Sequence, residues 1–312
     1  MLLALPIEIQ TQYYARLRST FPDLPISLVD HHSKVDPYIE NATILMTYGP
    51  MLSDHVVRDA VNLMWIQALG TGVDNLIDLP SLRPEVMITN VHGIHGAAMS
   101  EAAIMAMLAL SRDFPRVIRN QDQHKWERWP AQLLEAKTLG ILGVGAIAEE
   151  LALRCQALRM RVVGVSSAQR EVGGFDHVYA REELVRAVST FDFFLVLTPY
   201  SSATRNIVNG DIFRAMKPGS YFINLARGGV VDEAALMNSL QTGQLAGAAL
   251  DVFNEEPLPA GHPLWDFKNV VITPHLAGFD DGYAARALPT VIENIRRFLA
   301  GDTANMINVV RR

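Results

Sequence analysis

The sequence has little cysteine, no long apolar run and no excess of positive charge. Its single cysteine, Cys155, allows no internal disulfide, so a reducing cytoplasm is the expected location. The longest uninterrupted apolar run, residues 102–110, is too short to cross a bilayer, and we expect no membrane partner. With 27 basic against 33 acidic residues the net charge is −6, which argues against a nucleic-acid partner because phosphate backbones bind clustered lysine and arginine. A small molecule is therefore the expected ligand.

The first residues are apolar but do not have the pattern of a secretory signal. The first basic residue is Arg16, whereas a secretory signal starts with a cationic stretch. We therefore expect residues 2–5 to form a strand.

Short apolar runs alternate with helix-length segments along the chain, which is typical of an α/β protein with parallel sheets. Five strands are expected first and six later, at residues 2–5, 26–29, 44–47, 65–69, 86–89, 139–142, 162–165, 193–197, 221–225, 248–253 and 270–273. At about 150 residues per domain, the 312 residues predict two domains.

Two helices are expected to connect the sets of strands. Residues 99–112 lack a polar face, which predicts burial between layers. The last helix, residues 283–299, follows the N-cap candidates Asp280 and Asp281. We expect it to pack on the first set through residues at helical spacing, namely Leu288, Val291, Ile292, Ile295, Phe298 and Leu299. The prediction is two Rossmann-like or flavodoxin-like domains, with residues 98–279 inserted into a domain of residues 1–97 plus 280–312.

The strongest local signal is a predicted strand followed by Gly143-x-Gly145-x-x-Ala148 and a helix. Gly143 permits a tight turn, Gly145 lets the backbone approach a pyrophosphate, and Ala148 allows close packing of helix on strand. Amides at the start of the helix would face the phosphates, with Ala146 and Ile147 as further contacts. The inserted domain is therefore expected to bind a dinucleotide. Cys155 lies on the apolar face of this helix, so we expect it to be buried rather than nucleophilic.

The residues after the next predicted strand favour NADP over NAD. An NAD site would place a carboxylate about 20 residues after the glycine turn, to bind the ribose hydroxyls. This sequence has Ser166, Ser167 and Arg170 there instead. Hydroxyls and a guanidinium suit a 2′-phosphate, and no carboxylate repels it. The alternative is a polar turn with Arg170 in solvent, which leaves NAD possible.

Three further segments place an arginine, a carboxylate and a histidine after predicted strands. They are Ile223-Asn-Leu-Ala-Arg-Gly-Gly, Ala249-Leu-Asp-Val-Phe-Asn-Glu-Glu-Pro and Val271-Ile-Thr-Pro-His-Leu-Ala-Gly. Open α/β sheets bind ligands at this edge. In this order after the glycine turn, the segments resemble the D-isomer-specific 2-hydroxyacid dehydrogenase family, whose members include glyoxylate/hydroxypyruvate reductases. The resemblance runs from about residue 69 to residue 278.

The resemblance implies a catalytic set of Arg227, Glu256 and His275. The family arginine grips the substrate carboxylate and carbonyl, a task that suits a planar guanidinium. The histidine exchanges a proton with the carbonyl oxygen, because imidazole titrates near neutral pH, and the glutamate pairs with it. Glu255 is expected to be solvated. The implied cofactor contacts are Thr198, Pro199, Leu225, Ala226, Arg227, Asp251, His275 and Gly278, with Asp251 near the nicotinamide carboxamide.

In the first domain, Leu69-Gly-Thr-Gly-Val-Asp74 resembles the family's loop whose backbone amides hold the substrate carboxylate. The first domain is thus expected to be the substrate domain. The implied substrate contacts are Gly70, Thr71, Gly72, Val73, Arg227 and His275. Tyr48 and Met51 follow a first-domain strand and are expected to line the pocket.

The expected activity is hydride transfer between NADP(H), or NAD(H), and a small 2-oxo or 2-hydroxy acid, as in a glyoxylate/hydroxypyruvate or general 2-ketoacid reductase. No metal site is expected, since His92 and His95 lack a cysteine or carboxylate framework. Trp126 and Trp129 are either core residues or an inter-subunit wall, and relatives dimerise near this segment, so a homodimer is expected. The sequence ends soon after its last helix, and we expect no further C-terminal regulatory domain. The alternative function is a nicotinamide-sensing interaction protein or corepressor with little turnover.

Overall fold

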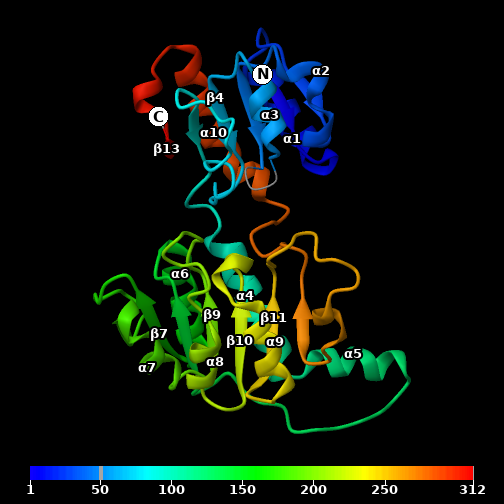
Figure 1. Cartoon of the computed structure of the whole chain (residues 1–312), viewed down its shortest axis with the longest axis vertical. Coiled ribbons are helices and arrows are strands. Elements are labelled where there is room, and N and C mark those ends of the chain that lie inside the picture. The colour runs from blue at the N-terminus through cyan, green and yellow to red at the C-terminus, as the bar shows by residue number, and fades with distance from the viewer. Residues whose placement is uncertain (49–51, 312) are drawn as a thin grey trace. The chain divides into compact units, whose positions relative to one another are not determined.

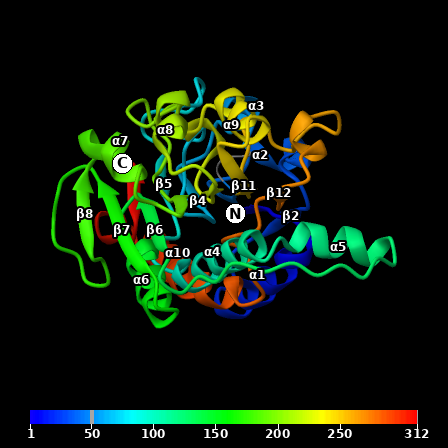
Figure 2. The same cartoon turned by 90° about the horizontal axis from the view of Figure 1, so that it is seen from below.

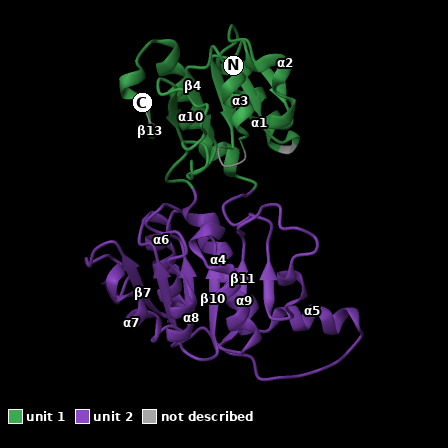
Figure 3. Cartoon of the chain, in the orientation of Figure 1, with its two compact units in different colours: residues 1–94, 281–312 green, residues 95–280 purple. Residues whose placement is uncertain are grey.

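The structure is a computed structural model that describes residues 1–48 and 52–311. The chain divides into unit 1, residues 1–94 and 281–312, and unit 2, residues 95–280 (Figure 3). The expected boundaries were 97/98 and 279/280. The α/β class with mainly parallel sheets is confirmed in both units.

Unit 1 is built on a six-stranded sheet in the order β13-β5-β4-β3-β1-β2 (Figure 1). Its parallel strands are β1 (Leu2–Ala4), β2 (Ser27–Val29), β3 (Ile44–Thr47), β4 (Trp65–Ala68) and β5 (Met87–Thr89). The short edge strand β13 (Val309–Arg311) is antiparallel to β5 and was not predicted. The order 2-1-3-4-5 of the parallel strands is the flavodoxin-like one. The helices of this unit are α1 (Ile7–Thr20), α2 (Asp36–Ile39), α3 (Asp54–Asp59) and α10 (Tyr283–Leu299).

Helix α10 returns the chain to unit 1, as the sequence predicts. Val291 and Ile295 are buried in the same core as strand residues Ile44 and Met46. Two details of the prediction were wrong. Gly282 takes the N-cap position in place of an aspartate, and Leu299 is exposed because the helix ends beside solvent.

Unit 2 contains a seven-stranded parallel sheet in the order β12-β11-β10-β9-β6-β7-β8. The strands are β6 (Thr138–Leu142), β7 (Arg161–Ser166), β8 (His177–Ala180), β9 (Phe193–Val196), β10 (Ser220–Asn224), β11 (Leu245–Leu250) and β12 (Val270–Ile272). β8 was not predicted: it is four residues long at the edge of the sheet, and only Val178 is buried. The central strands are buried throughout, which is why they appear in the sequence as continuous apolar runs.

Helices cover both faces of the unit 2 sheet (Figure 2). One face packs against α4 (Gly96–Ser111) and α6 (Ala146–Ala157), and the other against α7 (Leu184–Val188), α8 (Gly210–Ala215) and α9 (Glu233–Gln241). A further helix, α5 (Phe114–Asp122), has no buried residue. The expected burial of the apolar segment between layers holds for one face of α4, which includes Ala103 and Met107, whereas Met105 and Leu108 on the other face are exposed.

Among residues 1–48 and 52–311, no helix combines the length and the apolar character needed to span a membrane.

Candidate active site

The carboxyl ends of the parallel strands of unit 2 meet at one edge of the sheet, and the predicted site residues of this unit follow those ends. The strand order changes direction between β6 and β9, because β6 pairs with both β7 and β9. Open α/β sheets bind ligands at such a switch point. The segments there are residues 143–148 after β6, 166–170 at the end of β7, 198–199 after β9, 225–227 after β10, 251–256 after β11 and 275–278 after β12.

Glycine occupies positions 143 and 145 of the turn after β6 for different reasons. Gly143 has φ +102°, and a Cβ there would lie 2.5 Å from the backbone nitrogen of Thr198, so only glycine fits. Gly145 has an ordinary extended backbone, and a Cβ there would meet no atom within 4 Å. Since neither backbone conformation nor packing requires glycine at 145, close approach of a ligand remains as the reason. The turn and the amino-terminal end of α6, with Ala146 and Ile147, thus fit a dinucleotide pyrophosphate.

Arg170 lies beside this turn rather than away from it. Its Nη2 donates a hydrogen bond of 2.6 Å to the carbonyl of Val144, inside the glycine turn. Ser166 ends β7, and the adjoining Val165 carbonyl accepts a 2.9 Å hydrogen bond from Gly143 N–H. Ser166 and Ser167 therefore stand where the second strand of the sheet ends, and Arg170 reaches from the following segment to the glycine turn.

Arg227 is positioned by close contacts between backbones. A Cβ on Gly228 would lie 2.0 Å from the carbonyl carbon of Phe253, so the arginine segment can run against the segment that carries Glu256 only with glycine at 228. The buried Asn224 organises the same turn: its Nδ2 donates to the carbonyl of Arg227 at 3.0 Å and its Oδ1 accepts from Ala226 N–H at 3.0 Å. Sequence reasoning missed Asn224, although a polar residue at the end of an apolar strand was a usable signal.

His275 and Glu256 form a hydrogen-bonded pair. The distance between His275 Nδ1 and Glu256 Oε2 is 2.7 Å, and Glu256 Oε1 accepts a 2.9 Å hydrogen bond from Phe253 N–H. Burial raises the pKa of Glu256. The hydrogen bonds from His275 and Phe253 and the charges of His275 and Arg227 lower the pKa by more than burial raises it, so the pKa lies below its ordinary value. The side chains of His275 and Glu256 are 44% and 34% exposed. Because Nδ1 is engaged, Nε2 is the ring nitrogen left to face a substrate.

The remaining predicted contacts of unit 2 lie at the same edge. Thr198, Leu225, Ala226 and Asp251 are buried, and Gly278 packs close to His95 and Met99 at the start of α4. Glu255 is exposed, as expected. Glu256 is also exposed to solvent, but its carboxylate is paired with His275.

In unit 1, the predicted carboxylate-binding loop of Gly70, Thr71, Gly72 and Val73 follows β4. Its carbonyls are tied to the segment after β5: Val91 N–H donates to Gly70 at 3.2 Å, and Asn90 Nδ2 donates to Thr71 at 2.6 Å. Tyr283 OH donates to the Leu69 carbonyl at 2.7 Å. Tyr48 is partly buried, and burial raises its pKa to about 12. Met51 lies outside the described residues.

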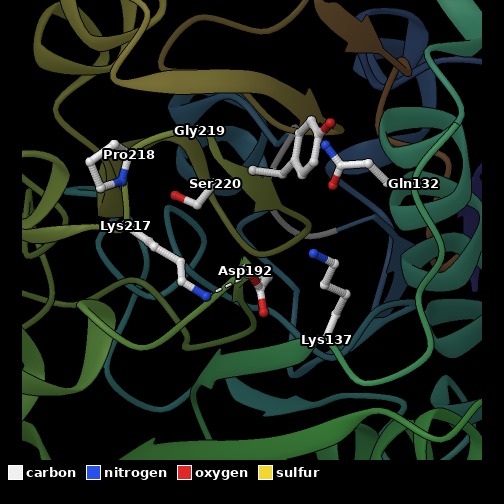
Figure 4. A pocket seen from close by; sticks show the side chains of 8 residues that line it. Gln132, Lys137, Asp192, Lys217, Pro218, Gly219 and Ser220 are labelled. Carbon is white, nitrogen blue, oxygen red and sulfur yellow. Dashed lines mark hydrogen bonds and ion pairs between the residues drawn. The ribbon is translucent and has the colours of Figure 1, made fainter. Parts of the chain in front are cut away.

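A cavity of about 350 Å³ lies at the opposite edge of the unit 2 sheet (Figure 4). Its lining residues Lys137, Asp192 and Lys217 come just before β6, β9 and β10, and Lys217 Nζ contacts Asp192 Oδ1 at 2.8 Å. The glycine turn and His275 follow the other ends of the strands. This cavity is therefore separate from the candidate active site.

Two other chemistries find no support in the described part of the chain. Cys155 is buried, as predicted, and burial raises its pKa to about 12, so it carries no thiolate near neutral pH. Among residues 1–48 and 52–311, no three histidine, cysteine or acidic side chains cluster as metal ligands would.

A doubly wound parallel sheet with a glycine turn at its switch point defines a dinucleotide-binding α/β protein, and the arginine, glutamate and histidine at the same edge are groups suited to redox chemistry on a carbonyl. Residues 104–277 match the family described as D-isomer specific 2-hydroxyacid dehydrogenase, NAD binding domain. The chain belongs to this family.

Individual relatives agree with this assignment. The chain is 36% identical over 223 residues to a D-3-phosphoglycerate dehydrogenase of Pongo abelii, a match that covers 71% of this chain but only 42% of that protein. A D-isomer specific 2-hydroxyacid dehydrogenase family protein from Aeromonas salmonicida superposes with a TM-score of 0.86 at 33% identity, covering 99% and 98% of the two chains. An NADPH-dependent glyoxylate/hydroxypyruvate reductase from Sinorhizobium meliloti, solved with NADP and sulfate, gives a TM-score of 0.83 at 27% identity, covering 99% and 97%.

Proposed function

We propose that the protein transfers hydride from a nicotinamide cofactor to a small 2-oxo acid, giving the D-2-hydroxy acid. The observation that carries the proposal is the 2.7 Å contact between His275 and Glu256 at the edge that also holds the glycine turn. Unit 2 is then the dinucleotide-binding domain and unit 1 the substrate domain.

The proposed chemistry uses three side chains of unit 2. When bound, the reduced cofactor supplies the hydride that adds to C2 of the substrate. His275 Nε2 gives a proton to the carbonyl oxygen, and Glu256 stabilises the imidazolium and fixes the ring through Nδ1. Arg227 binds the substrate carboxylate and polarises the carbonyl, since a guanidinium donates several hydrogen bonds without losing its charge. In the reverse direction His275 accepts the hydroxyl proton.

We propose NADP as the preferred cofactor. The support is the position of Arg170 against the glycine turn, together with the hydroxyls of Ser166 and Ser167 where an NAD site would hold a carboxylate. The Sinorhizobium meliloti relative was solved with NADP.

We propose glyoxylate, hydroxypyruvate and related short 2-oxo acids as substrates. The anchored loop of Gly70 to Val73 would hold the carboxylate through backbone amides. The name of the Sinorhizobium meliloti relative supports this class of substrate. The Pongo abelii D-3-phosphoglycerate dehydrogenase supports it less, because the match spans 42% of that protein's length.

We propose a homodimer in which α5 and the segment after it contact the partner. This arm exposes Phe114, Ile118, Trp126 and Leu133, and an exposed apolar surface of this kind marks an interface. Trp126 is thus not a core residue. A cytoplasmic location is part of the proposal, since the one cysteine is unpaired.

The test is a panel of glyoxylate, hydroxypyruvate, pyruvate and phenylpyruvate with NADPH and with NADH. We expect oxidation of the cofactor with at least one short acid and a higher kcat/KM with NADPH. A higher kcat/KM with NADH would contradict the cofactor proposal alone. Tight cofactor binding without turnover on the whole panel would contradict the reductase and favour the sensing protein.

A further inference from the structure

Asp251 is a buried carboxylate whose hydrogen bonds lie on both sides of His275. It is 1% exposed and directly follows β11. Oδ1 accepts from Thr273 Oγ1 and from Leu276 N–H, the latter at 2.8 Å, and Oδ2 accepts from Ala277 N–H at 2.9 Å. Its backbone carbonyl accepts from His275 N–H at 2.9 Å. Asp251 therefore accepts hydrogen bonds from four of the residues between 273 and 277.

The segment that carries His275 needs such a partner. His275 has φ +54°, a left-handed conformation that is unfavourable for a residue with a Cβ. Its side chain is 44% exposed, so packing alone does not fix this backbone. Strained conformations persist only where the surrounding structure determines them. His275 N–H also lies 3.1 Å from the Thr273 carbonyl, a contact within the same turn, and the Thr273 N–H donates to the Leu250 carbonyl at 3.0 Å. Asp251 is the residue outside the turn that binds it at several points, through its backbone carbonyl and both carboxylate oxygens.

We propose that Asp251 is a positioning residue that holds residues 273–277 in the conformation from which His275 can reach both Glu256 and the substrate. The inference rests on the proposed function for the role of His275. It differs from a role as a cofactor ligand, because its main contacts are with the chain itself. Both carboxylate oxygens accept hydrogen bonds from this segment, whereas an asparagine would turn an NH₂ group toward one of the donors.

The two roles are separated by comparing Asp251→Asn with Thr273→Val. The valine removes one donor to Asp251 and leaves the carboxylate in place. Amide hydrogen exchange of residues 276 and 277 is measured in cofactor-free protein, with the amides of α9 as the internal control. The dissociation constant of NADPH and the kcat and KM for the best 2-oxo acid are measured on the same variants.

For Asp251→Asn we expect roughly tenfold faster exchange at residues 276 and 277, because hydrogen bonds to a charged group are lost. We also expect a kcat lower by about 100-fold from misplacement of His275. Thr273→Val should change exchange and kcat in the same direction by less, with NADPH affinity kept. Thr273→Val also tests the proposal if the asparagine variant does not fold.

The proposal would be overturned if Asp251→Asn left amide exchange unchanged and weakened NADPH binding, while Thr273→Val changed neither exchange nor kcat. Asp251 would then act as a cofactor ligand. The exchange measurement needs no substrate. If the wild-type protein reduced no acid at all, the proposed function would fail while the role of Asp251 in holding this segment would still be tested.

Discussion

A histidine acts as a proton donor through whichever ring nitrogen its structural partner leaves open. Here Glu256 engages Nδ1 of His275 at 2.7 Å, so the second nitrogen is available for chemistry. The glutamate is itself oriented by Phe253 N–H. Its lowered pKa keeps it ionised to lower pH than an ordinary glutamate, and the pairing is lost only as the pH falls through that lowered value.

Glu256→Gln should slow 2-oxo acid reduction and remove the acid-side pH dependence that Glu256 supplies. The pKa of Glu256 lies below its ordinary value, so its charge beside His275 is present above that pKa and is lost as the pH falls through it. Glutamine carries no charge at any pH, so we expect the maximal rate to drop by roughly tenfold and the fall of kcat/KM that belongs to Glu256 at acidic pH to disappear. The measurement is a pH–rate profile with NADPH.

Glu255→Gln is the matched control, because it removes the carboxylate next in the chain and leaves the hydrogen bonds of Glu256 to His275 and Phe253 in place. Its profile should overlay that of the wild type. An unchanged profile in Glu256→Gln, or equal shifts in both variants, would show that the pair does not set the proton donor.

The individual residues that sequence reasoning missed serve the backbone rather than the ligand. Asn224 ties the turn before Arg227, and Thr273 donates to Asp251. Both are single polar residues at the ends of apolar strands. Without knowing which strand ends are neighbours, the sequence does not show what such a residue would contact.

At the scale of elements, the arm formed by residues 114–135 is held by its own ion pairs. Glu127 contacts Arg116, and its Oε2 lies 3.1 Å from Lys125 Nζ. The pKa of Glu127 is lowered to about 2, and the hydrogen bond from Arg116 is the largest cause. These contacts therefore persist until the solution is strongly acidic. Arg116 also stacks over Trp129 at 4.3 Å, while Trp126 is 93% exposed. The arm thus has a defined shape with an unpartnered indole.

Trp126→Ser should weaken self-association. Loss of a large apolar side chain from the centre of an interface commonly costs about 2 kcal/mol or more, which raises the dimer dissociation constant by roughly 30-fold. Sedimentation velocity over a concentration series measures this change.

Trp265→Ser is the control, because Trp265 is a half-exposed tryptophan of unit 2 outside the arm. It should leave the dissociation constant unchanged. A wild-type protein that sediments as a monomer, or a Trp126 variant that dimerises as well as the control, would contradict the interface.

Elements were predictable where burial left a strong pattern. The buried strands of both sheets and α10 were found because continuous or helically spaced apolar residues mark them. The edge strands β8 and β13 were not, although the edge strands β2 and β12 were. β8 buries one residue and β13 is three residues long, so neither leaves a long apolar run, and each depends on its neighbour for pairing. The exposed side of α4 was missed for a related reason: an apolar composition does not show whether the chain itself covers a surface.

At the scale of the molecule, the chain leaves unit 1 after residue 94, forms unit 2 and returns at residue 281. The sequence indicated this path because α10 carries an apolar face and the second set of strands already forms a complete sheet. The sequence did not predict the close approach of Gly228 to Phe253, which places the Arg227 and Glu256 segments side by side. That contact joins residues distant in the chain and depends on the order of strands.

We expect His275→Ala to bind the cofactor but to lose most of the rate of hydride transfer. Rapid mixing of NADPH-loaded protein with the best 2-oxo acid measures the single-turnover rate directly. His262→Ala serves as the control, because His262 also contacts a glutamate, Glu233, at 3.1 Å in unit 2. We expect His275→Ala to keep the NADPH dissociation constant within about twofold and to lose at least about 100-fold in rate, with His262→Ala close to wild type. A His275→Ala protein that oxidises NADPH at the wild-type rate would show that His275 is not the proton donor.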